Sequence, residues 1–279
     1  MVYGFTLLFL QPIRNAVVTL TLNTDVINTA TVPDVPHTGL ALVLDWIEYF
    51  IMIPLVYISL LFCLAAIILR FVSIYRAPKQ TYSLKIFPSA KKPGLAALAD
   101  TFAMPQVRRH QPVFWVFLMI FHISLVFLIL GHLDILPQIS LISEESQHML
   151  GAGLVGVGFT VPLFYFLFRR FRTPNREITV PADYLLLILI IFLALFGDLM
   201  SWGNSWTANG FVMTKQDFAQ YFAGLAQFTF ADPRLVLPGS HYHFAVIHVL
   251  LASLFFLILP FSKIVHAFLA LPINLLRRK

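Results

Sequence analysis

Apolar runs dominate the chain and form five stretches that are long enough to cross a bilayer. These stretches are residues 46–69, 112–136, 149–168, 184–202 and 244–271. Each approaches or exceeds the about 20 mostly apolar residues that a spanning helix needs. Trp46, Trp115 and Trp202 lie near the ends of such stretches, where aromatic residues anchor helices at the membrane interface. The pattern predicts an all-α integral membrane bundle.

The first 22 residues are also apolar, but Gln11, Pro12 and Arg14 interrupt them. A sixth span would bury Arg14 near its middle, which is costly without a partner. The alternative is an interfacial or partner-docking segment, and no basic region precedes it as in a cleaved signal peptide. We therefore expect five or six spans, with residues 1–45 as an N-terminal apolar segment and outer loop, and residues 46–279 as the transmembrane domain.

Charge predicts the orientation of these spans. Hydrophobic residues make up 59% of the chain and charged residues only 11%, against about 25% in soluble domains. All Lys and Arg residues except Arg14, Lys215 and Arg234 fall on the same side of the predicted spans. By the positive-inside rule, the basic loops and the C-terminus are cytoplasmic, in a multi-pass protein of the cell membrane. The net charge of +6 thus reflects topology and does not indicate nucleic-acid binding.

The cysteine content limits the redox chemistry that this chain can support alone. The single cysteine, Cys63, excludes an internal disulfide, a thiolate-held iron–sulfur cluster and covalent haem attachment through C-x-x-C-H. The basic connection of residues 70–110 is either a solvated loop or a docking surface for a cytoplasmic partner, and the sequence favours neither.

Histidines inside the second and fifth spans are the strongest chemical signal, because such residues are costly in a bilayer. His122 and His132 are ten residues apart, an axial rise of about 15 Å. His248 and His266 are eighteen residues apart, which is about five turns and about 27 Å in a straight helix. Both would then leave the same helix face, and a kink at Pro260 would help to reconcile the two rises.

The antiparallel course of these two spans predicts which histidines meet. His122 lies at the depth of His266 on the cytoplasmic side, and His132 at the depth of His248 on the outer side. Two bis-histidine pairs stacked across a helix bundle favour two low-spin b haems with an electron-transfer role. Gly131 would let a flat macrocycle approach the backbone, although it could equally serve helix packing.

Several outer-side features are candidates for a substrate site. Asp198 lies toward the outer end of the fourth span, where it either pairs with a polar neighbour or accepts a proton from a substrate. His148 opens the third span and could exchange protons with a ligand, or be an ordinary interface residue. Residues 214–228 predict an amphipathic helix along the outer membrane surface, covering a pocket there.

The chain resembles the membrane cytochrome b (gamma) subunit of respiratory nitrate reductase and its relatives. Three stretches carry the resemblance, together with the H-x9-H and H-x17-H spacings. They are residues 121–132, residues 179–183 leading into the fourth span, and residues 260–263 leading to His266. The resemblance covers roughly residues 46–279.

The resemblance implies specific roles for these residues. His132 and His248 would hold an outer b haem, and His122 and His266 an inner one. A quinol, menaquinol or ubiquinol, would be oxidised near the outer haem, and electrons would leave to a cytoplasmic iron–sulfur subunit. His148 stands where the nitrate-reductase branch has a lysine of the quinol pocket, so the mode of quinol binding can differ.

Two features favour one branch of this family. The long inner loop and the extra N-terminal segment look more like relatives in the membrane complex of dissimilatory sulfite reduction and in heterodisulfide reductase. We therefore expect the menaquinol-oxidising, electron-transfer subunit of such an oxidoreductase, with further membrane and periplasmic subunits. The alternatives are the gamma subunit of a nitrate reductase, a haem-free anchor, and a proton-coupled transporter. A transporter should show inverted repeats and broken helices, and the sequence indicates neither.

Overall fold

The computed structural model describes residues 39–77, 90–136, 139, 153–206, 215–237 and 242–278. Every regular element in these ranges is a helix. The N-terminal segment of residues 1–22 and the candidate His148 lie outside the described residues.

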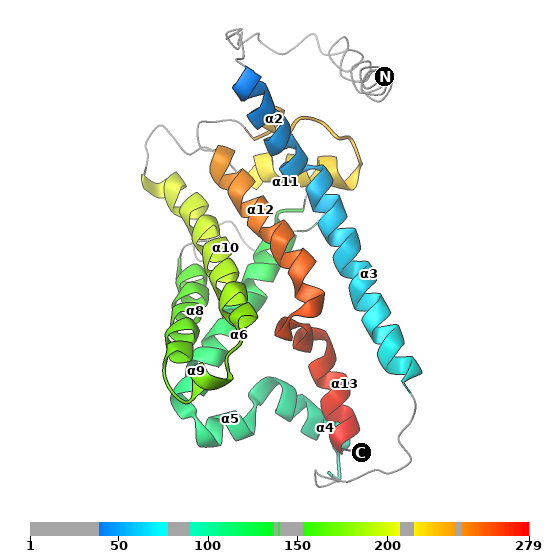
Figure 1. Cartoon of the computed structure of the whole chain (residues 1–279), viewed down its shortest axis with the longest axis vertical. Helices are drawn as coiled ribbons and strands as arrows, with labels where there is room; N and C mark the ends of the chain where they lie inside the picture. Colours follow the sequence, from blue (N-terminus) through cyan, green and yellow to red (C-terminus); the bar gives the residue numbers. More distant parts are fainter. Residues whose placement is uncertain are drawn as a thin grey trace.

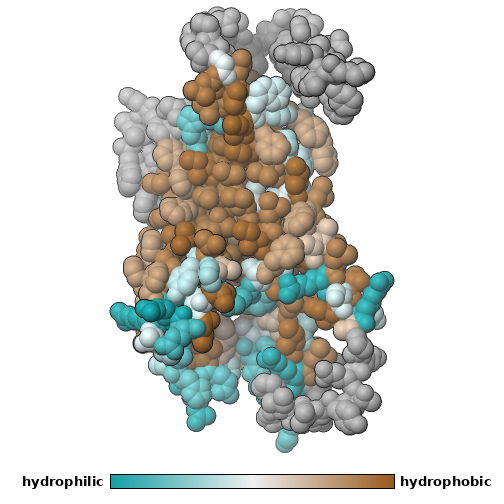
Figure 2. Space-filling model, in the orientation of Figure 1, coloured by the Kyte–Doolittle hydropathy of each residue, from teal (hydrophilic) through white to brown (hydrophobic). Residues whose placement is uncertain are grey.

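Five helical stretches are long and apolar enough to cross a membrane, as the sequence predicted. The helices that form them are α2 (Gly39–Met52) with α3 (Pro54–Arg76), α6 (Pro112–Asp134), α8 (Leu154–Phe171), α10 (Pro181–Trp206) and α12 (Tyr242–Ile258). Figure 2 shows apolar residues across the middle of one face, with hydrophilic residues gathered toward the lower end. The described part is thus an all-α, multi-pass membrane protein.

The spans pack as a row with two ends. α6 packs against α8, α8 against α10, α10 against α12, and α12 against α3. Figure 1 shows α12 in the middle, with α3 on one side and α6, α8 and α10 on the other. Among the described helices, α6 and α12 do not pack closely along their length, although they carry three of the four intramembrane histidines.

The first span begins earlier than predicted and is interrupted. α2 and α3 together run from Gly39 to Arg76, 38 residues, or about 57 Å at 1.5 Å per residue. The hydrocarbon core is only about 30 Å thick, so part of this stretch extends beyond it. The helix breaks at Ile53, where Pro54 begins α3. Met52 and Ile53 at this break are fully buried.

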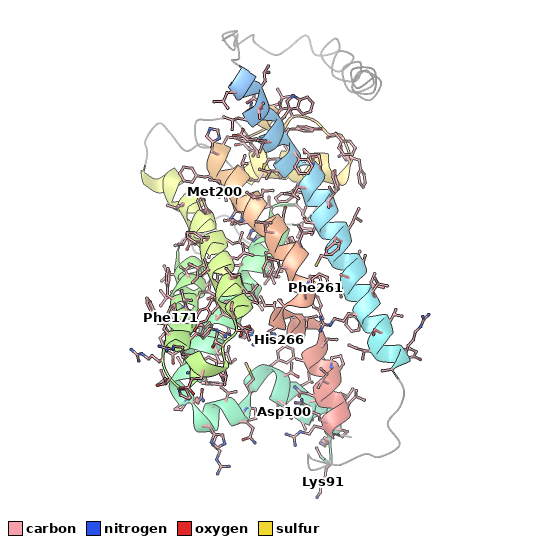
Figure 3. All side chains as sticks on the ribbon, viewed as in Figure 1. Lys91, Asp100, Phe171, Met200, Phe261 and His266 are labelled. Carbon is pink, nitrogen blue, oxygen red and sulfur yellow. The ribbon has the colours of Figure 1, made fainter. Side chains whose placement is uncertain are left out.

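The fifth span is broken rather than kinked, and the predicted continuous helix over residues 244–271 is wrong. α12 ends at Ile258, and two 3-10 turns, Leu259–Phe261 and Lys263–Val265, precede α13 (His266–Arg278). Pro260 has no N–H to donate and its ring clashes with the preceding turn, so it favours the end of the helix at this point. Figure 3 labels Phe261, in the first of these turns, and His266, at the start of α13.

The inner end of the chain folds back under the spans. α13 packs on α4 (Pro93–Leu98) and on the π turn Ala99–Ala103, which leads to α5 (Pro105–His110). Arg278 forms two bonds to the Asp100 carboxylate, of 2.6 and 2.9 Å. The predicted basic connection is therefore partly helical and is attached to the C-terminal helix.

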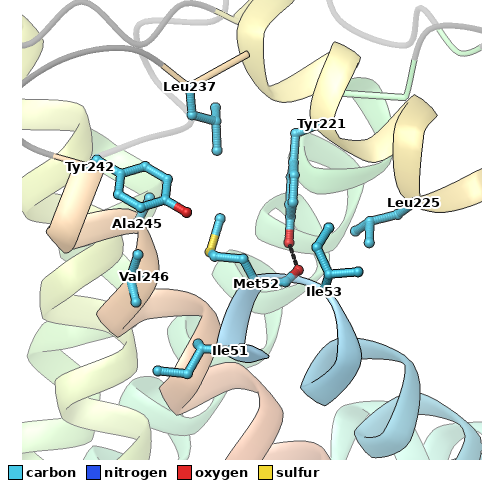
Figure 4. Close-up of a cluster of buried hydrophobic side chains, with 9 residues drawn as sticks. All are labelled: Ile51, Met52, Ile53, Tyr221, Leu225, Leu237, Tyr242, Ala245 and Val246. Carbon is cyan, nitrogen blue, oxygen red and sulfur yellow. Dashed lines mark hydrogen bonds between the residues drawn. The ribbon is translucent and has the colours of Figure 1, made fainter. Parts of the chain in front are cut away.

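The predicted amphipathic helix is present as α11 (Lys215–Ala226). Its apolar side packs on protein, in a cluster with the α2–α3 break and the start of α12. Figure 4 shows Tyr221 pointing at the break, where its hydroxyl donates to the Met52 carbonyl at 2.5 Å. α11 thus attaches the outer loop to the first span.

Candidate functional site

The structure brings the four intramembrane histidines together as two pairs. The ring centroids of His122 and His266 are 6.4 Å apart, with an angle of 71° between the ring planes. The centroids of His132 and His248 are also 6.4 Å apart, and their planes are within 13° of parallel. These are the partners that the depth argument predicted.

The break after α12 explains how unequal spacings give equal pairs. In a straight helix, the rise from His248 to His266 would exceed that from His122 to His132 by about 12 Å. The two turns at residues 259–265 interrupt the straight course of the helix, so this calculated rise does not apply, and His266 becomes the first residue of α13. The prediction that His248 and His266 leave one face of a single helix is therefore wrong, while their pairing with α6 stands.

All four rings are oriented in the same way, through Nδ1. Each Nδ1 lies within hydrogen-bond distance of a backbone carbonyl: His122 of Leu118 at 2.7 Å, His132 of Leu128 at 2.7 Å, His266 of Lys263 at 2.8 Å and His248 of Leu193 at 3.1 Å. A carbonyl can only accept, so Nδ1 carries the proton and Nε2 of the neutral ring keeps its lone pair. Histidines that bind metals commonly make this second bond, which fixes the ring and its tautomer.

The ring separation fits one metal ion between each pair. A metal–imidazole bond is about 2 Å long, and the ring centre lies about 1 Å further on, so two opposed imidazoles have centroids about 6 Å apart. In the described part of the chain, no three His, Cys, Asp or Glu side chains cluster as a metal site. Two protein ligands are too few for a structural zinc, but they are the full protein set of a bis-histidine haem.

A glycine that the sequence analysis missed lies against the outer pair. A Cβ atom on Gly197 would be 3.1 Å from Cε1 of His248 and 3.5 Å from its Nδ1. Any larger side chain in α10 would therefore displace this ring. Gly131, which the sequence analysis selected instead, is half-buried beside His132. The sequence feature that could have indicated Gly197 is its position directly before Asp198, the acid of the predicted fourth span.

Asp198 pairs with a polar neighbour, which is one of the two roles predicted for it. Its side chain is buried, and the Thr160 hydroxyl on α8 donates to its Oδ2 at 2.9 Å. Gly158 on α8 serves close helix packing, because a Cβ there would lie 2.5 Å from Oγ of Ser124 on α6.

Charged residues connect the elements at the outer end. The Arg234 guanidinium lies 2.6 Å from Asp45 and 2.6 Å from Glu48, both on α2. The hydrogen bonds that Arg234 donates to these carboxylates, that to Asp45 first, raise the pKa of Arg234. Glu48 also bonds Nδ1 of His243 at 2.7 Å. The network fixes α2 to the outer loop and to α12.

The described part of the chain is a multi-pass membrane bundle that carries two facing pairs of histidines. The chain belongs to the nitrate reductase gamma subunit family, whose model matches residues 106–279. It is also similar to the Hdr-like menaquinol oxidoreductase cytochrome b-like subunit of Archaeoglobus profundus (strain DSM 5631 / JCM 9629 / NBRC 100127 / Av18), with 27% identity over 164 residues. That match covers 54% of this chain and 46% of the relative, so it spans about half the length of the curated relative.

Proposed function

We propose that this chain is the membrane cytochrome b subunit of a menaquinol-oxidising complex and holds two b haems. His122 and His266 would hold the inner haem, and His132 and His248 would hold the outer one. The observation that carries the proposal is the pair of equal 6.4 Å ring separations. The carbonyl bonds of all four Nδ1 atoms support it further.

A bis-histidine haem supplies reversible one-electron transfer and has no open position for oxygen. The residues of this chain would bind and orient this cofactor and set its electrostatic surroundings. The backbone carbonyls fix the ring tautomers, and apolar side chains of the spans exclude water. The 71° and 13° ring angles differ, so the two sites are expected to give distinct low-spin spectra.

The proposed substrate is menaquinol, bound near the outer pair. Support comes from the relative, which is named as a menaquinol oxidoreductase subunit. Asp198 directly follows Gly197, where an added Cβ would lie against the His248 ring, so this acid lies at about the level of the outer pair. Asp198 and His148 are the proposed proton acceptors, and both protons leave on the outer side.

The proposed route takes electrons across the cell membrane to a cytoplasmic iron–sulfur subunit. Basic residues support this orientation, since Arg169, Arg170 and Arg278 lie at the end of the bundle that carries α13. We place the chain in a complex of the sulfite-reduction or heterodisulfide-reductase type, with other membrane and periplasmic subunits. The family description favours a second candidate, the gamma subunit of a nitrate reductase, and the copurifying cytoplasmic subunit distinguishes the two.

The remaining alternatives are less well supported. A haem-free anchor needs no matched histidine pairs. A transporter is expected to have broken helices, and the fifth span is broken, contrary to the sequence prediction. However, a transporter is also expected to show inverted repeats, and the sequence indicates none.

The replacement His132→Ala tests the proposal. The purified wild type should show two haems per chain and a b-type alpha band on dithionite reduction. The variant should keep only the inner haem and lose menaquinol oxidation. His243→Ala is the control, because His243 lies on the same face of the membrane but is exposed and bonded to Glu48. A wild type without haem, or a His132→Ala variant with both haems, would refute the assignment.

A further inference from the structure

His266 differs from the other three histidines in how it is held. His122, His132 and His248 lie within long helices, whereas His266 begins α13 directly after two short turns. Its Nδ1 bonds the carbonyl of Lys263, which is itself in the second turn. The position of this ring therefore depends on what fixes residues 259–265.

The first turn is fixed from α3. Pro260 is buried, and its carbonyl accepts a hydrogen bond of 2.5 Å from Nη1 of Arg70. The carbonyls at the end of a helix carry negative partial charge, so a guanidinium is a favourable partner there. The family model matches residues 106–279, which include Pro260 and not Arg70. The donor of this hydrogen bond therefore lies outside the matched part of the chain.

The second turn is fixed from α10. Nζ of Lys263 lies 2.6 Å from Oδ2 of Asp183, and Nη1 of Arg170 lies 3.2 Å from the same oxygen. The Asp183 side chain is only 6% exposed, so this carboxylate depends on the two cations. Within the turn, the Ser262 hydroxyl oxygen accepts from the backbone N–H of Ile264 at 3.1 Å.

We propose that Arg70 and Asp183 are positioning residues for His266. Arg70 holds the carbonyl end of α12, and Asp183 holds Lys263, whose carbonyl orients the His266 ring toward His122. Together they set the geometry of the inner pair without touching its rings. This inference rests on the proposed function, because it concerns the inner haem site.

The test compares Arg70→Gln and Asp183→Asn with the wild type in the purified full chain. Retention of the inner haem should fall about 10-fold or more, the usual cost of losing a partner that orients a metal ligand. The midpoint potential and the oxidised spectrum of the inner haem should also change, while those of the outer haem stay constant. His122→Ala supplies the reference spectrum of protein with the outer haem alone.

Two further variants separate positioning from general stability. Lys263→Met should reproduce the loss seen in Asp183→Asn, and Lys263→Arg should largely restore the inner haem because it keeps the ion pair. Arg234→Gln is the matched control, since it removes a paired guanidinium at the outer end and should leave the inner haem unchanged.

The outcomes distinguish this inference from the function on which it rests. A wild type without haem overturns both. A wild type with two haems, together with unchanged inner-haem retention and potential in Arg70→Gln and Asp183→Asn, overturns the positioning role alone. Equal loss of both haems in these variants also overturns it, because the effect would then be general.

Discussion

The replacement Gly197→Ala should weaken the outer site selectively. The added Cβ would lie 3.1 Å from Cε1 of His248, and ordinary contacts begin at 3.4 Å, so the ring must retreat by 0.3 Å or more. The ring is already bonded to the Leu193 carbonyl and faces His132, so it has little room. Overpacking of this kind costs about 1–3 kcal/mol, which corresponds to roughly 5- to 150-fold weaker haem retention.

The assay is the loss of each haem to a scavenging haem-binding protein, followed by reduced spectra that resolve the two sites. Gly39→Ala is the matched control, because nothing lies within 4 Å of the Cβ that it adds. Alanine favours a helix over glycine by about 1 kcal/mol, which offsets part of the overpacking cost in the protein as a whole. Unchanged outer retention, or equal loss from both sites, would refute the steric argument.

Two further predictions concern buried polar contacts. Thr160→Val removes the donor to the buried Asp198 carboxylate and should destabilise the protein by about 1–3 kcal/mol in thermal unfolding; an equal loss in Thr160→Ser would contradict this. Tyr221→Phe removes the donor to Met52 and should cost about 1–2 kcal/mol, with the exposed Tyr75→Phe as control. Burial raises the pKa of the Tyr221 hydroxyl. The folded state therefore keeps this proton at a pH where the unfolded tyrosine loses it, and the free energy of unfolding should fall with rising pH only above about 10. A Tyr221 that titrates at the ordinary pKa in the folded protein would contradict the burial.

The five spans and the histidine pairing could be predicted from the sequence because both depend on local patterns. A run of apolar residues is sufficient to indicate a span, and alternate crossing of the membrane then fixes which ends lie at the same depth. His122 and His266 could therefore be matched across 144 positions without coordinates. The roles proposed for the four histidines as haem ligands remain predictions.

The course of the fifth span could not be predicted in the same way. Pro260 signals a disturbance, but a proline permits either a kink or a complete break. The break in this chain is held by Arg70 from α3 and by Asp183 from α10, both distant in sequence. Such tertiary partners leave no periodic signal.

The site-facing glycine was missed for a related reason. Gly131 and Gly197 both lie in apolar spans near the outer side, and the sequence alone does not tell which of them faces a histidine ring. The choice depends on the rotation of α10 against α12, which places Gly197 against His248. The Thr160–Asp198 hydrogen bond likewise joins two residues that lie 38 positions apart in the sequence, on two different spans.

The position of α6 at one end of the row of spans has a consequence for biogenesis. Only 6% of the apolar stretch of α6 is buried by the described protein, against 22–28% for the other spans. Among the long helices, α8 is the one that packs closely along α6. Under the proposed function, the two haems would add contacts that join α6 to α12 and α13. If the proposed haems bind there, membrane proteases should remove a newly inserted chain without haem faster than the haem-loaded form.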